Sequence, residues 1–314
     1  MPKLSFQYVR QGQTESLLTF LERRFRYHDA GEWKKLISKG FVKVNGGKAK
    51  PGQILESRHK IVYEPPPVPE PEIDRSYTII YEDQHILAVT KSGNIPTSPS
   101  GKYWFNCLTH VLQDALGLDW LHAVHRLDRE TSGVNLFAKS KEAARVLGKS
   151  FQQGQVRKSY TAVVWGQMPF KEIFVSAPLR GAHEGSIHIK QAVHSGGRSS
   201  QTHFKLEALM EGASLMTAVP LTGRTHQIRA HASMLGHPVV GDKLYGATES
   251  SFLEWMKFGD RGSADRQLLH ATSLEFPHPL TNKTMLVKSP PDALMRLYVD
   301  RYAISPASNE IVKT

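Results

Sequence analysis

One stretch of the chain, residues 122–139, holds a carboxylate where it could act on a bound molecule. It reads His-Ala-Val-His-Arg-Leu-Asp-Arg-Glu-Thr-Ser-Gly-Val-Asn-Leu-Phe-Ala-Lys, so Asp128 lies on a polar connection between two apolar runs. Residues 133–139 are typical of a strand, and the Thr-Ser-Gly that leads into them favours a turn. We therefore expect Asp128 on a short, rigidly held surface loop, with Arg126 and Arg129 beside it.

Other chemistries are less compatible with the sequence. Metal ligands could come from the 15 histidines, and the candidate pairs are His122 with His125 and His226 with His231. Neither pair has the helical His-Glu-x-x-His spacing, and a single cysteine, Cys107, excludes thiolate clusters. A serine hydrolase is disfavoured because no Gly-x-Ser-x-Gly elbow occurs. The remaining alternative is that the loop aspartate only binds local amides or a neighbouring arginine.

A second segment with possible chemistry is residues 157–166. Its β-branched sequence, Arg-Lys-Ser-Tyr-Thr-Ala-Val-Val-Trp-Gly, is typical of a strand with Tyr160 near its start. A strand tyrosine commonly packs in a core or at a sheet edge. It can also give a nucleic-acid base that leaves its stack a new aromatic surface.

A third segment, residues 222–236, predicts a helix that carries an arginine. Thr225 can cap this helix, apolar residues at helical spacing form its buried face, and Gly236 ends it. Arg229 is one turn from Thr225 and projects from the side on which the helix starts. A hairpin at 202–209 and 214–221 leads into it.

The three segments together resemble the motifs of the RluA-type pseudouridine synthases. His-Arg-Leu-Asp-x-x-Thr-Ser-Gly resembles the central motif, whose Asp is the nucleophile, and Lys-x-Tyr-x-Ala-x-x-x-Gly resembles the second. Gly-Arg-Thr-His-Gln-Ile-Arg-x-His, followed by Leu-Gly-His-Pro-x-x-Gly-Asp, resembles the third, in which the second Arg pairs with the catalytic carboxylate. The resemblance runs from about residue 77 to residue 287.

The resemblance implies an enzyme that isomerises uridine in RNA. Asp128 would be the nucleophile that attacks the uracil ring or the ribose, and Arg229 would keep it ionised and oriented. Tyr160 would stack on the base and could help remove the carbon 5 proton. A carbon–carbon bond replaces a carbon–nitrogen bond within one nucleotide, so no cofactor, metal or second substrate is required. The further RNA-binding residues that we predict are Arg126, Arg129, Arg224, His226, Lys43 and Lys50.

The resemblance also implies the fold. We expect an α+β catalytic domain with a mixed, largely antiparallel sheet, a central cleft and flanking helices. A strand pair at 79–91 opens it, with Lys-Ser-Gly-Asn at 91–94 where the family usually has Lys-Pro-x-Gly. Helices follow at 108–116, capped by Asn106, and at 140–152. An RNA-binding or ribosome-assembly protein that has lost catalysis on this fold is the alternative.

The N-terminal fifth of the chain predicts a separate basic domain. Residues 1–64 hold 13 Lys and Arg against 6 Asp and Glu, a net charge of +7. Helices at 16–26 and 32–39, followed by Lys-Gly-x-Val-x-Val-Asn-Gly, resemble a small α/β RNA-binding domain named after a ribosomal small-subunit protein. The proline-rich residues 65–76 predict a stiff linker, so the catalytic domain comprises residues 77–314.

Composition is consistent with this interpretation. The 314 residues are 40% hydrophobic and 22% charged, with a formal net charge of +11. Such a charge favours a polyanionic partner, here ribosomal or transfer RNA. No apolar run approaches the ~20 residues of a membrane span. The start of the chain has no apolar signal core, and with one cysteine the sequence predicts a cytoplasmic protein, which we expect to be a monomer.

Overall fold

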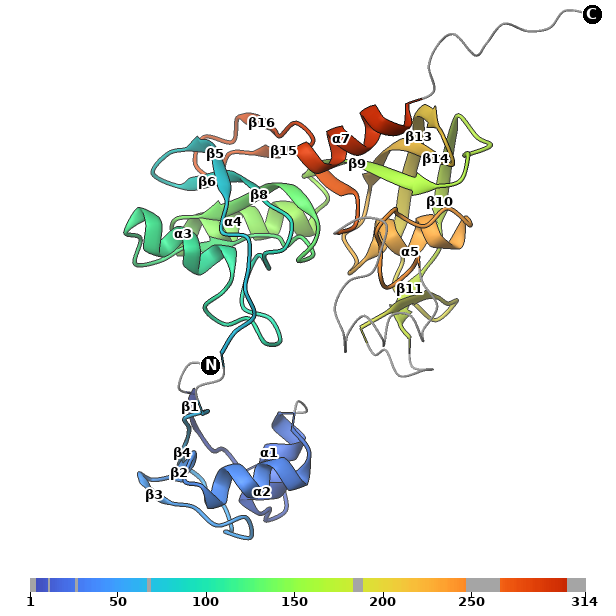
Figure 1. Cartoon of the computed structure of the whole chain (residues 1–314). Helices are drawn as coiled ribbons and strands as arrows, with labels where there is room; N and C mark the ends of the chain where they lie inside the picture. The colour runs from blue at the N-terminus through green and yellow to red at the C-terminus, as the bar shows by residue number, and fades with distance from the viewer. Residues whose placement is uncertain are drawn as a thin grey trace, which may run out of the picture. The chain divides into compact units, whose positions relative to one another are not determined.

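The computed structural model describes residues 4–10, 12–25, 28–66, 69–182, 189–246 and 266–303 (Figure 1). The chain forms two compact units, residues 1–71 with 101–105, and residues 72–100 with 106–314. In the first unit the Glu70 carboxylate accepts hydrogen bonds from the backbone N–H groups of Trp104 (3.0 Å) and Phe105 (2.9 Å). Residues 101–105 therefore belong to the same compact unit as residues 1–71.

The N-terminal unit consists of two helices and a four-stranded antiparallel sheet of order β1-β4-β2-β3. Its elements are β1 (Leu4–Gln7), α1 (Leu17–Arg24), α2 (Ala30–Ser38), β2 (Val42–Val44), β3 (Gly47–Lys48) and β4 (Lys60–Tyr63). Ser16 caps α1 and Asp29 caps α2 through their side-chain oxygens. Asn45 and Gly46 have φ angles of 51° and 79°, as the β2–β3 turn requires. Trp33 is fully buried in the core of this unit.

The second unit is organised around a mixed sheet of ten strands. Their order is β10-β13-β14-β9-β15-β8-β6-β5, with β16 beside β15 and β7 beside β8. Among the strand pairings formed by the described residues of this sheet, only that of β15 with β8 is parallel. The strands are β5 (Tyr77–Glu82), β6 (Ile86–Lys91), β7 (His122–Ala123), β8 (Ser132–Ala138), β9 (Arg157–Trp165), β10 (Glu172–Ser176), β13 (Gln201–Met210), β14 (Ala213–Pro220), β15 (Leu269–Pro277) and β16 (Thr284–Lys288). The expected α+β fold with a largely antiparallel sheet is confirmed.

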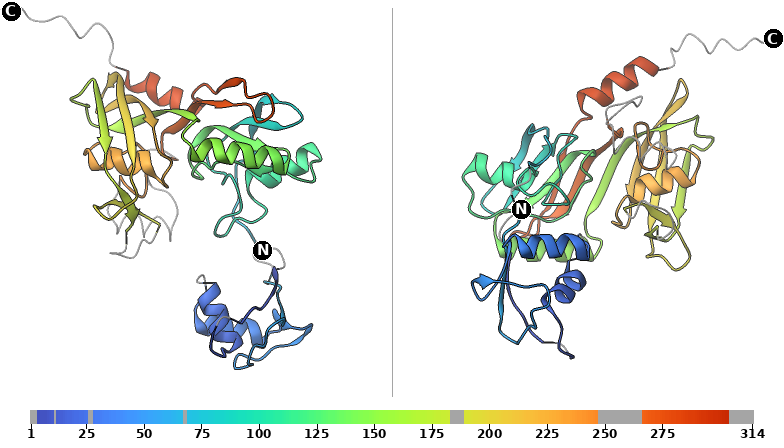
Figure 2. Two further views of the ribbon diagram at one scale, coloured as in Figure 1. Left: turned by 180° about the vertical axis from the view of Figure 1, so that it is seen from behind. Right: turned by 60° about the horizontal axis from the view of Figure 1, so that its bottom comes forward.

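Helices cover different parts of this sheet. They are α3 (Leu108–Leu116), α4 (Lys141–Gln152), α5 (Gln227–Met234) and α7 (Ala293–Tyr302), and a small pair of strands, β11 (Leu179–Gly181) and β12 (Gln191–Val193), completes the unit. Helix α5 lies beside β13 and β14, and α4 lies against β8 (Figures 1 and 2). Helix α3 shares a core with β6 and β8. Among the described residues, no helix combines the length and the apolar character needed to span a membrane.

Two predicted helix caps are wrong. Cys107, not Asn106, is the N-cap of α3, and the Asn106 side chain instead accepts a hydrogen bond from Arg75 (2.9 Å). His226, not Thr225, is the N-cap of α5. The His226 backbone is left-handed (φ 55°), whereas a residue that caps a helix through a side-chain hydroxyl typically has an extended backbone. The predicted cap of α4 by Ser140 is confirmed.

The loop that carries Asp128 is held on both sides by buried hydrogen bonds. Lys91 is fully buried, and its amine donates to the carbonyl oxygens of Ser92 (2.9 Å), Ile95 (2.7 Å) and Arg129 (3.0 Å). On the other side the Leu127 backbone N–H donates to the hydroxyl of Thr97 (3.1 Å). The residues before and after the aspartate are thus tied to the same segment, which follows β6. These hydrogen bonds hold the backbone on both sides of Asp128 in place.

Gly133 shows how closely this loop approaches the strand that pairs with it. Its φ of +108° belongs to a region that L side chains rarely adopt, and a Cβ there would lie 2.2 Å from the Ala271 carbonyl oxygen. Both residues belong to the short parallel pairing of β8 with β15. Only glycine therefore allows the two strands to meet at this point.

We expect Gly133→Ala to lower the free energy of unfolding by about 3 kcal/mol or more, because strain and backbone overlap add. Urea denaturation measures it. Gly148→Ala is the matched control, since Gly148 lies in α4 with nothing within 4 Å of its Cβ position. The free energy of unfolding of that variant should rise by about 0.5–1 kcal/mol. Equal effects of the two substitutions would contradict the close approach.

Candidate active site

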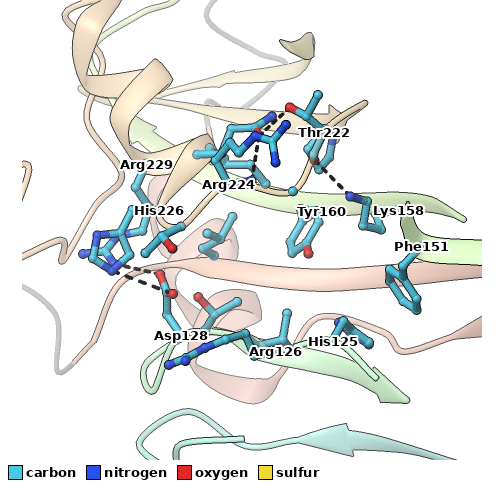
Figure 3. Close-up of a pocket in the computed structure, with 18 residues that line it drawn as sticks. His125, Arg126, Asp128, Phe151, Lys158, Tyr160, Thr222, Arg224, His226 and Arg229 are labelled. Atoms are coloured by element: carbon cyan, nitrogen blue, oxygen red, sulfur yellow. Dashed lines mark hydrogen bonds and ion pairs between the residues drawn. The ribbon is translucent and has the colours of Figure 1, made fainter. Parts of the chain in front are cut away.

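A cavity of about 350 Å³ lies where the three segments that carry the sequence motifs meet (Figure 3). The loop before β8 contributes Asp128, and strand β9 contributes Tyr160. The β14–α5 connection contributes Arg224 and His226, and helix α5 contributes Arg229. The structure therefore brings together the three residues predicted to be catalytic. Their order along the chain does not show this, because Asp128 and Arg229 are 101 residues apart.

Asp128 and Arg229 form the ion pair expected from the sequence. The Arg229 Nη1 donates to the Asp128 Oδ2 at 2.8 Å. The Asp128 side chain is 27% exposed, whereas the Arg229 side chain is 9% exposed. The carboxylate consequently faces the cavity, while the guanidinium behind it is almost closed off from solvent.

A second carboxylate, that of Asp242, fixes Arg229 from the opposite side. Arg229 Nε donates to Asp242 Oδ2 (2.6 Å) and Nη2 donates to Oδ1 (2.8 Å), which is a bidentate pair. Asp242 Oδ1 also accepts from the backbone N–H groups of Leu244 (2.9 Å) and Tyr245 (3.0 Å). The guanidinium carbon lies 5.1 Å from the centre of the Tyr245 ring. Asp242 was not predicted to belong to the site, although it is the Asp of the Gly-Asp that ends the third motif.

These contacts determine the charge of the site. Burial raises the pKa of the Asp128 carboxyl, but His226, Arg229 and Arg126 outweigh burial and hold that pKa below its ordinary value. Burial likewise lowers the pKa of Arg229, and Asp242 and Asp128 reverse the effect and raise it. Asp128 is therefore an ionised carboxylate at neutral pH, which is the form a nucleophile requires.

His226 contacts both Asp128 and the tyrosine beneath Arg229. Its Nε2 lies 3.9 Å from Asp128 Oδ1, and its Nδ1 lies 3.1 Å from the Tyr245 hydroxyl. Burial lowers the pKa of His226 despite the nearby carboxylate. The imidazole is therefore neutral at neutral pH, and the permanent charge of Arg229 is what keeps Asp128 ionised there.

Tyr160 lies in the middle of the cavity wall (Figure 3). It is opposite Ala218 of β14 and Ala271 of β15, two small residues that leave space beside its ring. Burial and the Asp128 charge raise the pKa of the Tyr160 phenol. The ring is thus a neutral aromatic surface next to the carboxylate.

The predicted RNA-binding residues occupy different places. Arg126 and Arg224 line the same cavity as Asp128. Arg129 does not, because it lines a second cavity of about 630 Å³ and donates to Asn94 (3.0 Å) and Glu130 (3.0 Å). Asp128 and Arg129, although adjacent in the chain, therefore line different cavities.

Lys43 and Lys50 belong to the N-terminal unit. The Lys43 amine donates to the Glu64 carboxylate at 3.0 Å, so an internal ion pair already occupies it. The Lys50 side chain is exposed, and no ion pair to it occurs among the described residues.

His125, Phe151 and Lys158 also line the cavity, although none of them was predicted to belong to the active site. The His125 ring stacks on Phe151 with 5.1 Å between centroids, and its Nε2 accepts from the Leu136 backbone N–H (3.0 Å). Burial lowers the pKa of His125 to about 3, so this imidazole is neutral. The Lys158 amine donates to the Thr222 carbonyl oxygen at 3.0 Å.

The histidine pairs considered as metal ligands are engaged otherwise. Both ring nitrogens of His231 form hydrogen bonds, to the Thr202 hydroxyl (2.9 Å) and the Ala177 carbonyl oxygen (2.9 Å). Within the described ranges no group of three or more His, Cys, Asp or Glu is arranged to hold a metal ion.

An ionised, arginine-bound carboxylate next to a neutral aromatic ring, on a largely antiparallel sheet, defines the pseudouridine synthase class. Comparison with known proteins agrees. The RNA pseudouridylate synthase family profile matches residues 85–234. Over 286 residues the chain is 32% identical to ribosomal large subunit pseudouridine synthase C of Pasteurella multocida, covering 88% of this chain and 86% of that protein.

Two further relatives support the assignment. An uncharacterized RNA pseudouridine synthase of Bacillus subtilis, YjbO, is 38% identical over 219 residues, which are 68% of this chain and 71% of that protein. The structure of human RNA pseudouridylate synthase domain containing 1 superposes with a TM-score of 0.57 at 28% identity, covering 70% of this chain and 86% of that chain. The chain belongs to the RNA pseudouridine synthases of the RluA type, which are isomerases.

We expect Asp242→Asn to lower the single-turnover rate about tenfold or more while RNA affinity stays within a few fold. The amide keeps the acceptor for the backbone N–H groups but removes the charge that fixes Arg229. Rapid-quench kinetics with tritium release from uridine measures the rate, and filter binding measures affinity. Asp300→Asn, at an exposed position of α7, is the control. A changed affinity with an unchanged rate would place Asp242 outside the reaction.

Proposed function

We propose that this protein isomerises uridine in large-subunit ribosomal RNA, with Asp128 as the nucleophile. The observation that carries the proposal is the 2.8 Å pair of Asp128 with Arg229 at a cavity wall that also holds Tyr160. The choice of RNA is supported by the relative from Pasteurella multocida, whose name specifies the large ribosomal subunit. The fold and the family are those of pseudouridine synthases.

The proposed reaction begins with the uridine turned out of its stack and laid against Tyr160. Asp128 attacks the uracil ring or the ribose, the bond between ribose and ring nitrogen breaks, and the base turns. A bond from ribose to carbon 5 then forms, the bond to Asp128 breaks, the carbon 5 proton leaves, and the ring nitrogen that was bonded to the ribose takes up a proton. The raised pKa of Tyr160 suits it to stacking, because the phenol is protonated and carries no charge beside Asp128.

Arg229 has two roles in this proposal. Its bidentate bond to Asp242 prevents it from following the carboxylate, so Asp128 remains directed at the cavity. The Arg229 charge stabilises the ionised form of Asp128. Because Arg229 contacts that carboxylate through one nitrogen and one oxygen, Oδ2, a covalent bond from Asp128 to the substrate is still possible. The other oxygen, Oδ1, faces His226.

Arg126 and Arg224 are proposed to hold the RNA at the cavity, and Lys50 to hold it at the N-terminal unit. We propose that a single copy in the cytoplasm performs the reaction, because Asp128, Tyr160, Arg229 and Asp242 all come from one chain. An RNA-binding protein without catalysis is not favoured. Such a protein would have no need for a buried guanidinium between two carboxylates.

The first test of the proposed function uses Asp128→Asn, which preserves shape but removes the nucleophile. Pseudouridine mapping of ribosomal and transfer RNA from cells with the wild-type gene, without it, and with the variant should show at least one site that only the wild type restores. Binding of the variant to ribosomal RNA should stay within a few fold. Restoration of every site by the variant would refute the nucleophile, and a lost site in transfer RNA would redirect the substrate.

The second test concerns the basic N-terminal unit. Lys50→Gln should make the dependence of log affinity on log salt shallower by about 0.7–0.9, because one fewer counterion is released. Lys43→Gln should change the slope less, since Glu64 already neutralises Lys43. Lys205→Gln on β13, where Lys205 pairs with Glu207, is the control. A slope unchanged in Lys50→Gln would show that this surface does not bind phosphates.

A further inference from the structure

Two cations that line the cavity, Lys158 and Arg224, take no part in the bond-making and bond-breaking steps of the proposed reaction. Figure 3 shows Asp128, His226 and Arg229 grouped at one side, Tyr160 in the middle, and Lys158 at the other side near Thr222. Arg224 lines the same cavity, and its charge acts on Lys158. Because neither residue contacts the reactive carboxylate, the two together need a different explanation.

Lys158 is held in place by its own strand and by the β14–α5 connection. It precedes Tyr160 by two residues in β9, so both side chains emerge on the same face of the sheet. Its amine donates to the Thr222 carbonyl oxygen (3.0 Å) and lies 3.5 Å from the position of a Cβ on Gly223. One donor is thereby used, and an ammonium group has three.

Arg224 is fixed in a similar way. Its backbone N–H donates to the Gln227 side-chain oxygen (3.0 Å), and its Nε donates to the Ser199 carbonyl oxygen (3.0 Å). Both bonds go to neutral groups and leave the terminal guanidinium nitrogens for another acceptor. Arg224 and Lys158 therefore flank the same backbone segment, residues 222–224.

No carboxylate compensates these two charges within the described part of the chain. Neither residue has an ion pair there, and Asp128, the one acidic residue among those described that line the cavity, is occupied by Arg229. Burial and the neighbouring Arg224 lower the pKa of Lys158. Two like charges partly removed from water oppose each other, and an anion between them would relieve both penalties.

We infer that Lys158 and Arg224 bind a backbone phosphate that flanks the target uridine. The inference rests on the proposed function, because a base placed against Tyr160 directs its own sugar–phosphate chain along the cavity. Lys158 lies about 7 Å along β9 from Tyr160, at a strand rise of ~3.3 Å per residue. A point charge and a planar fork from two directions suit the several oxygens of a phosphate. This site would hold the nucleotide while its base turns.

The test measures binding alone, so it does not depend on turnover. All proteins carry Asp128→Asn, and the probe is a short single-stranded RNA with one central uridine and an uncharged methylphosphonate on its 5′ or its 3′ side. In the parent protein one of the two neutral linkages should weaken binding about tenfold, which identifies the phosphate. Lys158→Met should weaken binding of the all-phosphate RNA similarly and abolish the sensitivity to that linkage.

Two further variants make the result decisive. Arg224→Gln leaves the bond from Lys158 to Thr222 and should also abolish the sensitivity. Lys205→Met removes an exposed charge of β13 outside the cavity and should preserve it. Full sensitivity in both Lys158→Met and Arg224→Gln, or no sensitivity at either linkage in the parent protein, overturns the inference. Failure of the proposed function would appear in the pseudouridine mapping experiment. The effect of Lys158 and Arg224 on phosphate sensitivity is measured by binding alone and could still be found in that case.

Discussion

The site depends on one buried guanidinium held between two carboxylates. Arg229 is 9% exposed and the Asp242 side chain is fully buried, so each charge is stable only while the other is in place. Asp242 is fixed in turn by the backbone N–H groups of Leu244 and Tyr245. Asp128 is the most exposed member of this chain of charges, with 27% of its side chain accessible. Its reactivity thus follows from a geometry set mostly by residues that no substrate touches.

Sheet topology explains how such distant residues meet. Strands β8 and β9 carry Asp128's loop and Tyr160, yet they are not neighbours, because β15 lies between them. The β15–β8 pairing is parallel and involves only His270–Ala271 with Ser132–Gly133. A strand from late in the chain therefore joins the two halves of the sheet, and Gly133 allows its close approach. The cavity is complete only when β15 has paired on both edges.

Local sequence patterns predicted the features that are themselves local. The hairpins and the Ser140 cap follow from local patterns, whereas the grouping of Asp128, Tyr160 and Arg229 was implied by the resemblance of three separate motifs to one family. The Asn106 and Thr225 caps failed because a nearby arginine and a left-handed His226 override the intrinsic capping preference. The partnership of Asp242 with Arg229 and the direction of Arg129 depend on tertiary contacts, which no single motif encodes. Lys158 was overlooked for the same reason, since its place in the cavity depends on tertiary contacts with the β14–α5 connection.

The two arginines of the third motif show how position divides one residue type between two tasks. Arg229 begins its side chain inside α5, between carboxylates, and its charge is consumed within the protein. Arg224 precedes the left-handed turn at His226, so its side chain leaves in another direction, toward neutral acceptors and open space. The turn therefore separates a charge that controls Asp128 from a charge that remains available to RNA. Along the cavity this gives an ionised carboxylate bound by arginine, an aromatic ring, and two cations that have no ion pair within the described part of the chain. These groups suit the reacting atoms, the base and a phosphate of one nucleotide.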